Sequence, residues 1–489
     1  MESLKQKTIK GVSWSIIDNI VGSGITFLVG LLLARILSPE EFGLIGIITI
    51  FIAVFNSIVD SGFSNALIRK NNATNIDYNT AFIFNLILSF LLVLSLFLLS
   101  PSVGVFFDQP QLVSLTRAMS LIILINAFAL VQRTLLVKKV DFKTQTKISV
   151  ISSVSSGVIG ILMAILGFGV WSIVAQQLSR QFLNTLFLWI LSKWRPKLEF
   201  SFKSFKELFS FGWKLLLSGL IDTIWKQFYQ IIIGKFYSPS SLGQFSRATQ
   251  FTDIFSSNLT SVVNRVSYPV LSSIQDDKIR LKEAYKKIIK LTMFIAFVLM
   301  LGLAAIAKPL VLVLIGEKWL PSVEFLQIIC FSAMLYPLHS LNLNMLQVKG
   351  RSDLFLILEI VKKTIAIGPI LLGIFIGIKS MLWGSVLTSF ISYYLNSYYS
   401  GRDLDYGIME QIKDLLPSFL FSIIIAALVW TISLINISPF FLLPLQLSTG
   451  FIVIFAIGEL TKMNEYIELK IIIISTINKT SIWKKINKF

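Results

Sequence analysis

The sequence contains very few of the side chains on which metal sites and disulfide-stabilised folds depend. Its 489 residues include one cysteine, Cys330, and one histidine, His339. A single cysteine excludes an internal disulfide, and a single histidine excludes a histidine-based metal cluster. Both residues fall in the tenth hydrophobic run, where we expect them to pack, and we expect neither a metal nor a cofactor.

Nucleotide-binding loops are also missing. No GxGxxG or GxxxxGK[ST] motif occurs where a strand-to-helix turn would use it. The sequence therefore predicts no site for nucleotide hydrolysis. Any active transport must draw on an ion gradient, the membrane potential or the gradient of the substrate.

Charged residues are scarce and apolar residues are abundant. The chain is 14% charged and 55% hydrophobic, whereas soluble domains are about 25% charged, and its mean hydropathy is +0.77. Runs of about 20 apolar residues span a bilayer. We predict fourteen such spans, at residues 12–36, 43–65, 79–101, 112–136, 147–166, 169–192, 211–234, 244–268, 290–315, 323–346, 355–377, 381–399, 412–435 and 439–460.

An internal duplication organises these spans. Residues 38–43 read SPEEFG and residues 238–243 read SPSSLG, at an offset of 200, and Ser61 recurs as Ser261 at the same offset. Six runs fit in each copy, so both copies enter and leave on the same side of the membrane and are parallel repeats. We therefore predict an all-α integral membrane protein, with two six-helix lobes around a central cavity and two further helices at the C-terminus.

The duplication predicts five segments along the chain. They are an N-terminal six-helix lobe (1–193), a cytoplasmic amphipathic linker (194–210), a C-terminal six-helix lobe (211–400), two additional transmembrane helices (401–460) and a basic cytoplasmic tail (461–489). In the linker, Phe202, Phe205 and Phe209 share one helical face. Ser204 and Glu207 have the spacing of a capping box, which predicts that an interfacial helix begins there.

Lysine and arginine are distributed unequally between the two sides. One side carries only Arg35, Lys235, Lys308, Lys318 and Lys379, and the other carries most of the remainder. This bias places both termini in the cytoplasm, and it accounts for the net charge of +18 better than nucleic-acid binding does. The first run is too long for a signal peptide and lacks a cleavage site, so we expect it to remain as the first span.

The loops on the outer side are short, which argues against a membrane enzyme. Lipid-linked glycosyltransferases usually hold their acceptor with a sizeable outer segment. Glu40 and Glu41 form an acidic pair there, but the duplicated positions are Ser240 and Ser241. Residues beside a turn proline are commonly solvated, so we expect no catalytic residue.

Polar and ionisable residues inside the spans are the informative chemistry, because a charge at bilayer depth normally faces a bundle interior or a water-filled cavity. They follow helical spacing on the first two helices of each repeat. The cations that we expect to bind an anionic substrate are Lys214, Lys226, Arg247 and the mid-helix Arg180, and the acidic residues that would bind a coupling cation or balance the lysines are Asp18, Asp60, Asp222 and Asp253. An alternative interpretation is that Asp222 and Lys226 form an i,i+4 ion pair that neutralises itself.

Several motifs resemble one family over nearly the whole chain. They are KTIKGVSWS near the start, LLLARILSPEEFGLIGI, DSGFSNALI, NRVSYPVLSSIQDD at 264–277 and IGEKW at 315–319. The chain resembles the Wzx-type polysaccharide flippases of the multidrug/oligosaccharidyl-lipid/polysaccharide exporter superfamily, particularly the colanic-acid exporter branch. Arg265 lies in one of these motifs, and it would either meet a phosphate entering from the cytoplasm or anchor the end of its helix.

The resemblance implies a flippase that moves an undecaprenyl-diphosphate-linked oligosaccharide across a bacterial inner membrane. The two lobes would rock about the cavity. The expected partners are the lipid-linked substrate, membrane lipids and polysaccharide polymerase machinery, without nucleic acid. Two alternatives share the fold, a cation-coupled small-molecule exporter and a lipid II flippase, and a membrane glycosyltransferase or polymerase is disfavoured by the short outer loops.

Overall fold

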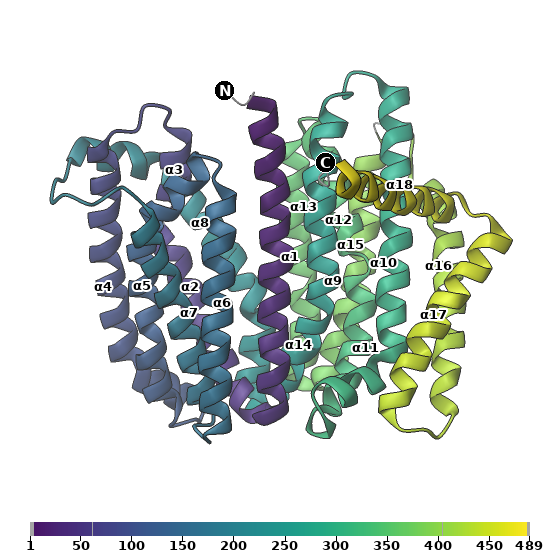
Figure 1. The fold of residues 1–489 in the computed structure, drawn as a ribbon, viewed down its shortest axis with the longest axis horizontal. Helices are drawn as coiled ribbons and strands as arrows, with labels where there is room; N and C mark the ends of the chain where they lie inside the picture. The colour runs from purple at the N-terminus through teal and green to yellow at the C-terminus, as the bar shows by residue number, and fades with distance from the viewer. Residues whose placement is uncertain (1–3, 61, 403, 487–489) are drawn as a thin grey trace. The chain divides into compact units, whose positions relative to one another are not determined.

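The computed structural model describes residues 4–60, 62–402 and 404–486, with side chains for Trp14 and from Val21 to Ser475. Every regular element in these ranges is helical (Figure 1), so the prediction of an all-α protein is confirmed. The first part of the chain forms α1 (Leu4–Ile36), α2 (Pro39–Asp60), α3 (Phe63–Arg69), α4 (Asn75–Phe106), α5 (Leu112–Lys138), α6 (Phe142–Ile165), α7 (Trp171–Leu191), α8 (Phe202–Phe236) and α9 (Pro239–Ser272). The remainder forms α10 (Lys278–Leu314), η1 (Glu317–Trp319), α11 (Pro321–Ala333), α12 (Tyr336–Val348), α13 (Ser352–Ile365), α14 (Ile367–Phe375), α15 (Ile378–Arg402), α16 (Ile408–Thr431), η2 (Ile432–Leu434), α17 (Pro439–Thr461) and α18 (Asn464–Ile486).

Eight helical segments of the described chain are long and apolar enough to cross a membrane. They are Pro39–Arg69, Asn75–Phe106, Leu112–Lys138, Phe142–Ile165, Lys278–Leu314, Pro321–Val348, Ile408–Leu434 and Pro439–Thr461. The helices α8 and α9, the first two of the second repeat, have 35 and 34 residues. Both are longer than the roughly 20 residues that a span needs. The fold is that of a multi-pass membrane protein, and the count of fourteen spans is compatible with it but stays a prediction.

Tertiary contacts divide the chain into two compact units, Met1–Ser246 and Arg247–Phe489. The first unit includes α8, the first helix of the second repeat, which packs against α2, α3 and α4. The five segments predicted from the duplication follow sequence similarity, and they stay predictions.

The two copies of the duplicated turn have the same local structure. In the first copy the Glu41 N–H donates to Ser38 Oγ at 3.3 Å. In the second copy the Ser241 N–H donates to Ser238 Oγ at 3.2 Å. Proline follows the serine in both copies and begins a helix, where its missing N–H costs no hydrogen bond. The Ser-Pro pair is thus the start signal of α2 and of α9.

The two turns also pack directly on each other. A Cβ atom added to Gly43 would lie 1.7 Å from the Pro239 carbonyl oxygen, and one added to Gly243 would lie 1.9 Å from the Pro39 carbonyl oxygen. Only glycine permits backbones to approach so closely. The duplicated glycines therefore form a reciprocal contact within the first unit.

Three predicted spans contain a break. The second run divides into α2 and α3 around Gly62, whose φ is +69°, a value that favours glycine. The tenth run divides after Ala333 and the eleventh after Ile365. Pro337 and Pro369 follow each by four residues. Because proline has no N–H to donate to the carbonyl four residues earlier, each helix ends at that carbonyl.

The predicted linker differs from the observed segment. Instead of forming a separate interfacial helix capped at Ser204, the chain continues without regular structure to Ser201, whose side chain accepts a hydrogen bond from the Ser204 N–H and caps α8. Phe205 then packs on α3 and α4, with ring centroids 6.1 Å from Phe63 and 4.9 Å from Phe84. This aromatic residue of the linker is therefore held within the first unit.

An ion cluster ties the same end of α8 to its neighbours. Lys70 Nζ lies 2.9 Å from a Glu207 oxygen and 3.0 Å from an Asp77 oxygen. Burial acts to lower the pKa of Lys70, but hydrogen bonds to Glu207 and Asp77 outweigh it and raise the pKa above its usual value. Glu207, which has capping-box spacing in the sequence, thus binds a lysine instead.

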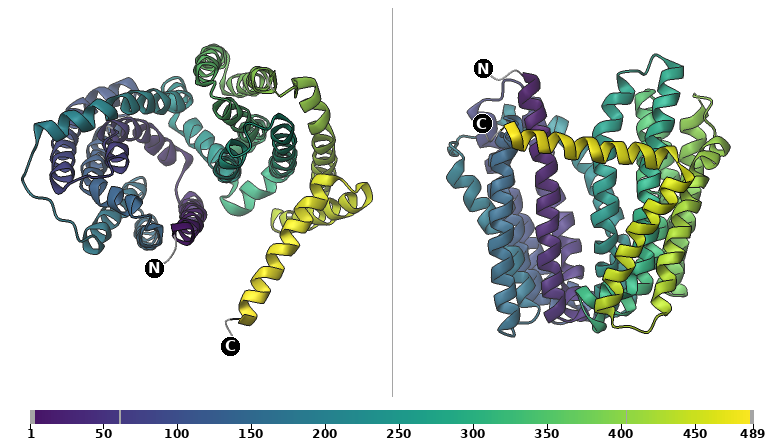
Figure 2. Two further views of the ribbon diagram at one scale, coloured as in Figure 1. Left: turned by 90° about the horizontal axis from the view of Figure 1, so that it is seen from above. Right: turned by 45° about the vertical axis from the view of Figure 1, so that its right-hand side comes forward.

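In the second unit, α16 and α17 pack beside α10 (Figure 1). A buried apolar cluster containing Phe294, Phe421 and Tyr466 joins them to α18, which runs crosswise to α16 and α17 (Figure 2). A polar chain lies nearby: Asn342 Nδ2 donates to Ser397 Oγ at 3.0 Å, and Ser397 donates to Gln411 Oε1 at 3.0 Å. The helices beyond the duplication are therefore integral to the second unit.

Candidate functional site

Three charged residues of α8 were predicted to belong to the site. Two of them form an ion pair with each other, and the third, Lys214, does not take part in it. Lys226 Nζ lies 2.7 Å from Asp222 Oδ2, one helical turn away, and the two side chains are 72% and 50% exposed. The ion pair considered as an alternative interpretation is thus present. Lys214 is exposed, and no acidic side chain of the described residues lies within ion-pair distance of it.

Three further predicted residues lie on α9 in the second unit. Arg247 is half-buried, whereas Asp253 and Arg265 are exposed. Asn264, beside Arg265, accepts hydrogen bonds from Ser340 Oγ at 2.6 Å and from Asn344 Nδ2 at 2.8 Å. These bonds join α9 to α12.

Two predicted residues occupy other helices of the first unit. Arg180 is half-buried on α7. Asp18 belongs to α1, and its side chain lies outside the described residues. The central cavity between the two lobes, which would gather these charges, stays a prediction.

A cavity of about 320 Å³ opens at the surface of the first unit, and the predicted residue Asp60 lines it. Its polar lining is Asn56, Asp60, Ser64, Asn126, Arg133 and Thr134, from α2, α3 and α5. The amides form a chain in which Gln181 Nε2 donates to Asn126 Oδ1, and Asn126 Nδ2 donates to Asn56 Oδ1 at 2.9 Å. The cavity therefore combines a hydrogen-bonded polar part with an apolar part formed by residues such as Val59, Leu130 and Val137.

Sequence reasoning missed Arg133 as a member of this site. It was one of the many cations that define the cytoplasmic side, although its electrostatic partner is Asp60. Asn126 and Arg133 are seven residues apart, which places them on one face of α5 after two turns. That spacing was the available signal.

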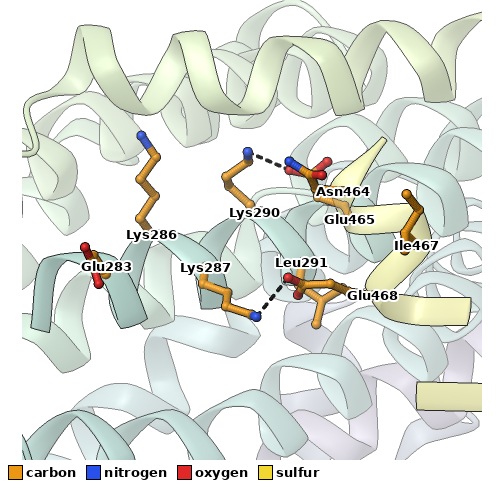
Figure 3. Close-up of a pocket in the computed structure, with 9 residues that line it drawn as sticks. All are labelled: Glu283, Lys286, Lys287, Lys290, Leu291, Asn464, Glu465, Ile467 and Glu468. Carbon is orange, nitrogen blue, oxygen red and sulfur yellow. Dashed lines mark ion pairs between the residues drawn. The ribbon is translucent and has the colours of Figure 1, made fainter. Parts of the chain in front are cut away.

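A second cavity, of about 430 Å³, lies between α10 and α18 (Figure 3). Its lysines are already paired. Lys286 Nζ lies 2.9 Å from Asp414, Lys287 Nζ lies 2.8 Å from Glu468, and Lys290 Nζ lies 2.7 Å from Glu465. The ion pairs of Lys287 and Lys290 thus form a clamp that holds α18 against α10, and the positive charges that line this cavity are neutralised.

The remaining candidates have structural partners. Glu41 is half-buried and caps α2 through Ser38. Cys330 is buried in α11, and His339 Nε2 lies 3.0 Å from Ser389 Oγ. These residues serve the fold.

Comparison with known proteins identifies relatives across most of the chain. The model of a family described as "Polysaccharide biosynthesis protein" matches residues 32–324. The succinoglycan biosynthesis transport protein ExoT of Rhizobium meliloti is 26% identical over 384 residues, which are 78% of this chain and 78% of that protein. The lipopolysaccharide biosynthesis protein WzxC of Escherichia coli is 25% identical over 377 residues, 76% of each chain.

Solved structures show the same fold. The lipid II flippase MurJ in an inward closed conformation superimposes with a TM-score of 0.73 and 16% identity, over 93% of this chain and 98% of MurJ. An inward-facing multidrug resistance transporter of the MATE family superimposes with a TM-score of 0.62 and 18% identity. The match covers 78% of this chain and 94% of that transporter. The MATE transporter is described as a member of the MOP superfamily. The family match and the similarity to WzxC confirm the resemblance to Wzx-type flippases. Because the family model covers more than half of the sequence, this chain belongs to the family described as "Polysaccharide biosynthesis protein".

Proposed function

We propose that the protein is a flippase that moves an undecaprenyl-diphosphate-linked oligosaccharide from the inner to the outer leaflet of the bacterial cytoplasmic membrane, for polysaccharide biosynthesis. Membership of the family supports this, as do relatives named for succinoglycan transport and lipopolysaccharide biosynthesis. The shared fold with a lipid II flippase supports a lipid-linked substrate. The protein acts by transport, without a covalent step.

The observation that carries the proposal is the set of cations on the polar faces of long helices in an otherwise apolar protein. Lys214 is exposed on α8 without an acidic partner among the described residues. Clustered cations bind the oxygens of a diphosphate through charge-assisted hydrogen bonds. Lys214, Lys226, Arg247, Arg265 and Arg180 are the residues that would hold the diphosphate.

Alternating access of the two lobes would carry the head group. The sugars cross within the polar interior while the polyprenyl tail stays in lipid. Asp18, Asp60, Asp222 and Asp253 either bind a coupling cation or balance the basic residues. The contact between Asp222 and Lys226 favours balancing for that pair.

The cytoplasmic bias of lysine and arginine supports an orientation with both termini inside the cell. The basic tail then lies at the inner leaflet, where anionic lipids attract it. Polysaccharide polymerase machinery is the expected partner on the opposite side, because the flipped oligosaccharide is its substrate.

A small-molecule exporter of the same fold is the second candidate, since a MATE transporter superimposes on the chain. Its cargo would be cationic, so an excess of basic side chains in the polar region disfavours it. A lipid II flippase is the third candidate, and relatives named for polysaccharide synthesis disfavour it.

Deletion of the gene in its own host tests the proposal. We expect loss of surface polysaccharide and accumulation of lipid-linked oligosaccharide on the inner leaflet. Complementation with wild type restores the glycan, and Lys214→Ala, Lys226→Ala or Arg247→Ala restores it less. Normal surface glycan in a deletion strain that has no second flippase would overturn the assignment and favour the small-molecule exporter.

A further inference from the structure

The helix break beside Asp60 belongs to the first repeat alone. The duplicated position of Gly62 is Val262, at the same offset of 200, and it lies inside the continuous helix α9. At Gly62, by contrast, φ is +69° and an added Cβ would lie 2.4 Å from the Gly212 carbonyl oxygen. The break is therefore built into α2–α3 and held by α8.

Irregular backbone within a span occurs where it is buried in protein or lines a polar cavity, and discontinuous helices often mark binding sites. The break here adjoins the 320 Å³ cavity that contains Asn56, Asp60 and Arg133. Asp60 and Arg133 are both exposed, and both line the cavity. They act on each other electrostatically but form no ion pair with any described residue within 4 Å.

The charges of the cavity select the chemistry of its ligand. A diphosphate would meet the carboxylate of Asp60, and a cation would meet the guanidinium of Arg133. A neutral polyhydroxyl group suits both, because each hydroxyl is a donor and an acceptor at once. The volume falls in the range of about 300 to 1,000 Å³ that is usual for small-ligand sites.

The chain of hydrogen-bonded amides would orient such a ligand, because it fixes where donors and acceptors lie. Gln181 and Asn126 fix the orientation of Asn56 through their hydrogen bonds. Asn56 Nδ2 is thereby left as a donor beside the Asp60 carboxylate, an acceptor, one helical turn away on α2. Alternating fixed donors and acceptors match the hydroxyls of a sugar ring.

We propose that this cavity is a sugar-binding subsite, which holds hydroxyl groups of the oligosaccharide head group while the cations of α8 and α9 hold the diphosphate. It rests on the proposed function and deepens it, since it assigns a neutral-sugar site to the first unit. Asn56 and Asp60 on α2 and Asn126 on α5 bind hydroxyl groups, and Arg133 donates from the same face of α5 as Asn126.

The test compares two lipids with one protein. Purified full-length protein in nanodiscs is titrated with lipid-linked oligosaccharide extracted from the host, and separately with undecaprenyl diphosphate that carries no sugar. We expect Asn56→Leu and Asn126→Leu to weaken binding of the first lipid roughly tenfold, as the loss of one or two hydrogen bonds predicts, and to leave the second unchanged. Asn85→Leu on α4, a buried amide outside the cavity, is the matched control and should change neither.

The outcomes separate the subsite from the proposed function. Equal weakening of both lipids, or no change in either, would overturn the sugar subsite alone. If wild-type protein binds neither lipid, both the proposed function and the subsite fail. Should a leucine variant fail to fold, Asp60→Asn keeps the shape of the side chain, and it should weaken binding of the oligosaccharide lipid only.

Discussion

Substitution of Gly43 by alanine should destabilise the protein far more than an ordinary helical Gly→Ala change. The added Cβ would lie 1.7 Å from the Pro239 carbonyl oxygen, whereas ordinary van der Waals contact begins near 3.4 Å. The start of α2 and the start of α9 must therefore separate by more than 1 Å. Overpacking of this kind costs about 1–3 kcal/mol and sometimes more.

Gly219 provides the matched control for this change. It lies within α8, and its added Cβ would meet nothing closer than Ser57 Oγ at 3.8 Å. Alanine there should stabilise the protein by about 0.5–1 kcal/mol, because glycine in a helix interior loses more backbone entropy. The two substitutions should thus shift stability in opposite directions.

Thermal unfolding in detergent, followed by tryptophan fluorescence, measures the difference. We expect Gly243→Ala to resemble Gly43→Ala, because its added Cβ lies 1.9 Å from the Pro39 carbonyl oxygen. The double variant should cost less than the sum of the two, since one separation of the helices relieves both clashes. A Gly43→Ala protein that unfolds at the wild-type temperature would refute the close contact.

Three other predictions follow from described contacts. Gly62→Ala should cost more stability than Gly167→Ala in thermal unfolding, because both have positive φ but only at Gly62 does backbone lie within reach of the new Cβ, at 2.4 Å; equal losses, near the 1–2 kcal/mol expected for the left-handed conformation alone, would contradict the tight approach to α8. Lys287→Glu should loosen α18 and expose the tail to protease, and the added change Glu468→Lys should restore protection because it re-forms the pair now at 2.8 Å; a double variant that is cleaved like the single would argue against the clamp. Lys214→Ala should reduce surface polysaccharide more than Lys214→Arg does, because arginine keeps the positive charge; equal loss in both would indicate a role other than charge.

The sequence predicted the helical architecture because composition and periodicity depend on local physics. The spans were predicted to begin at residues 43 and 244, whereas the prolines of the duplicated turn begin α2 at Pro39 and α9 at Pro239. A proline follows the breaks at Ala333 and Ile365 by four residues, but proline alone does not predict a break, because residues such as Pro101 and Pro309 lie inside continuous helices. The α2–α3 break was harder to foresee, because it depends on contact between Gly62 and Gly212, which are distant in sequence.

The site was predicted only in part for the same reason. Asp222 and Lys226 are neighbours on one helix, so their pairing was foreseeable from spacing. Arg133 meets Asp60 across two helices, and its position near the end of a span made it resemble a topological cation. The sequence shows which residues share one face of a helix. It does not show which residues of a neighbouring helix that face contacts.

The reciprocal turn contact has an evolutionary consequence. Each copy presents the same surface, a proline carbonyl and a glycine, to the other, which is the geometry of an isologous dimer interface. An ancestor with one repeat would have carried both halves of this interface and would have paired with itself through it. A present-day fragment that ends before the second repeat keeps Pro39 and Gly43, and we expect it to self-associate in cross-linking experiments and to lose that association when Gly43 becomes alanine.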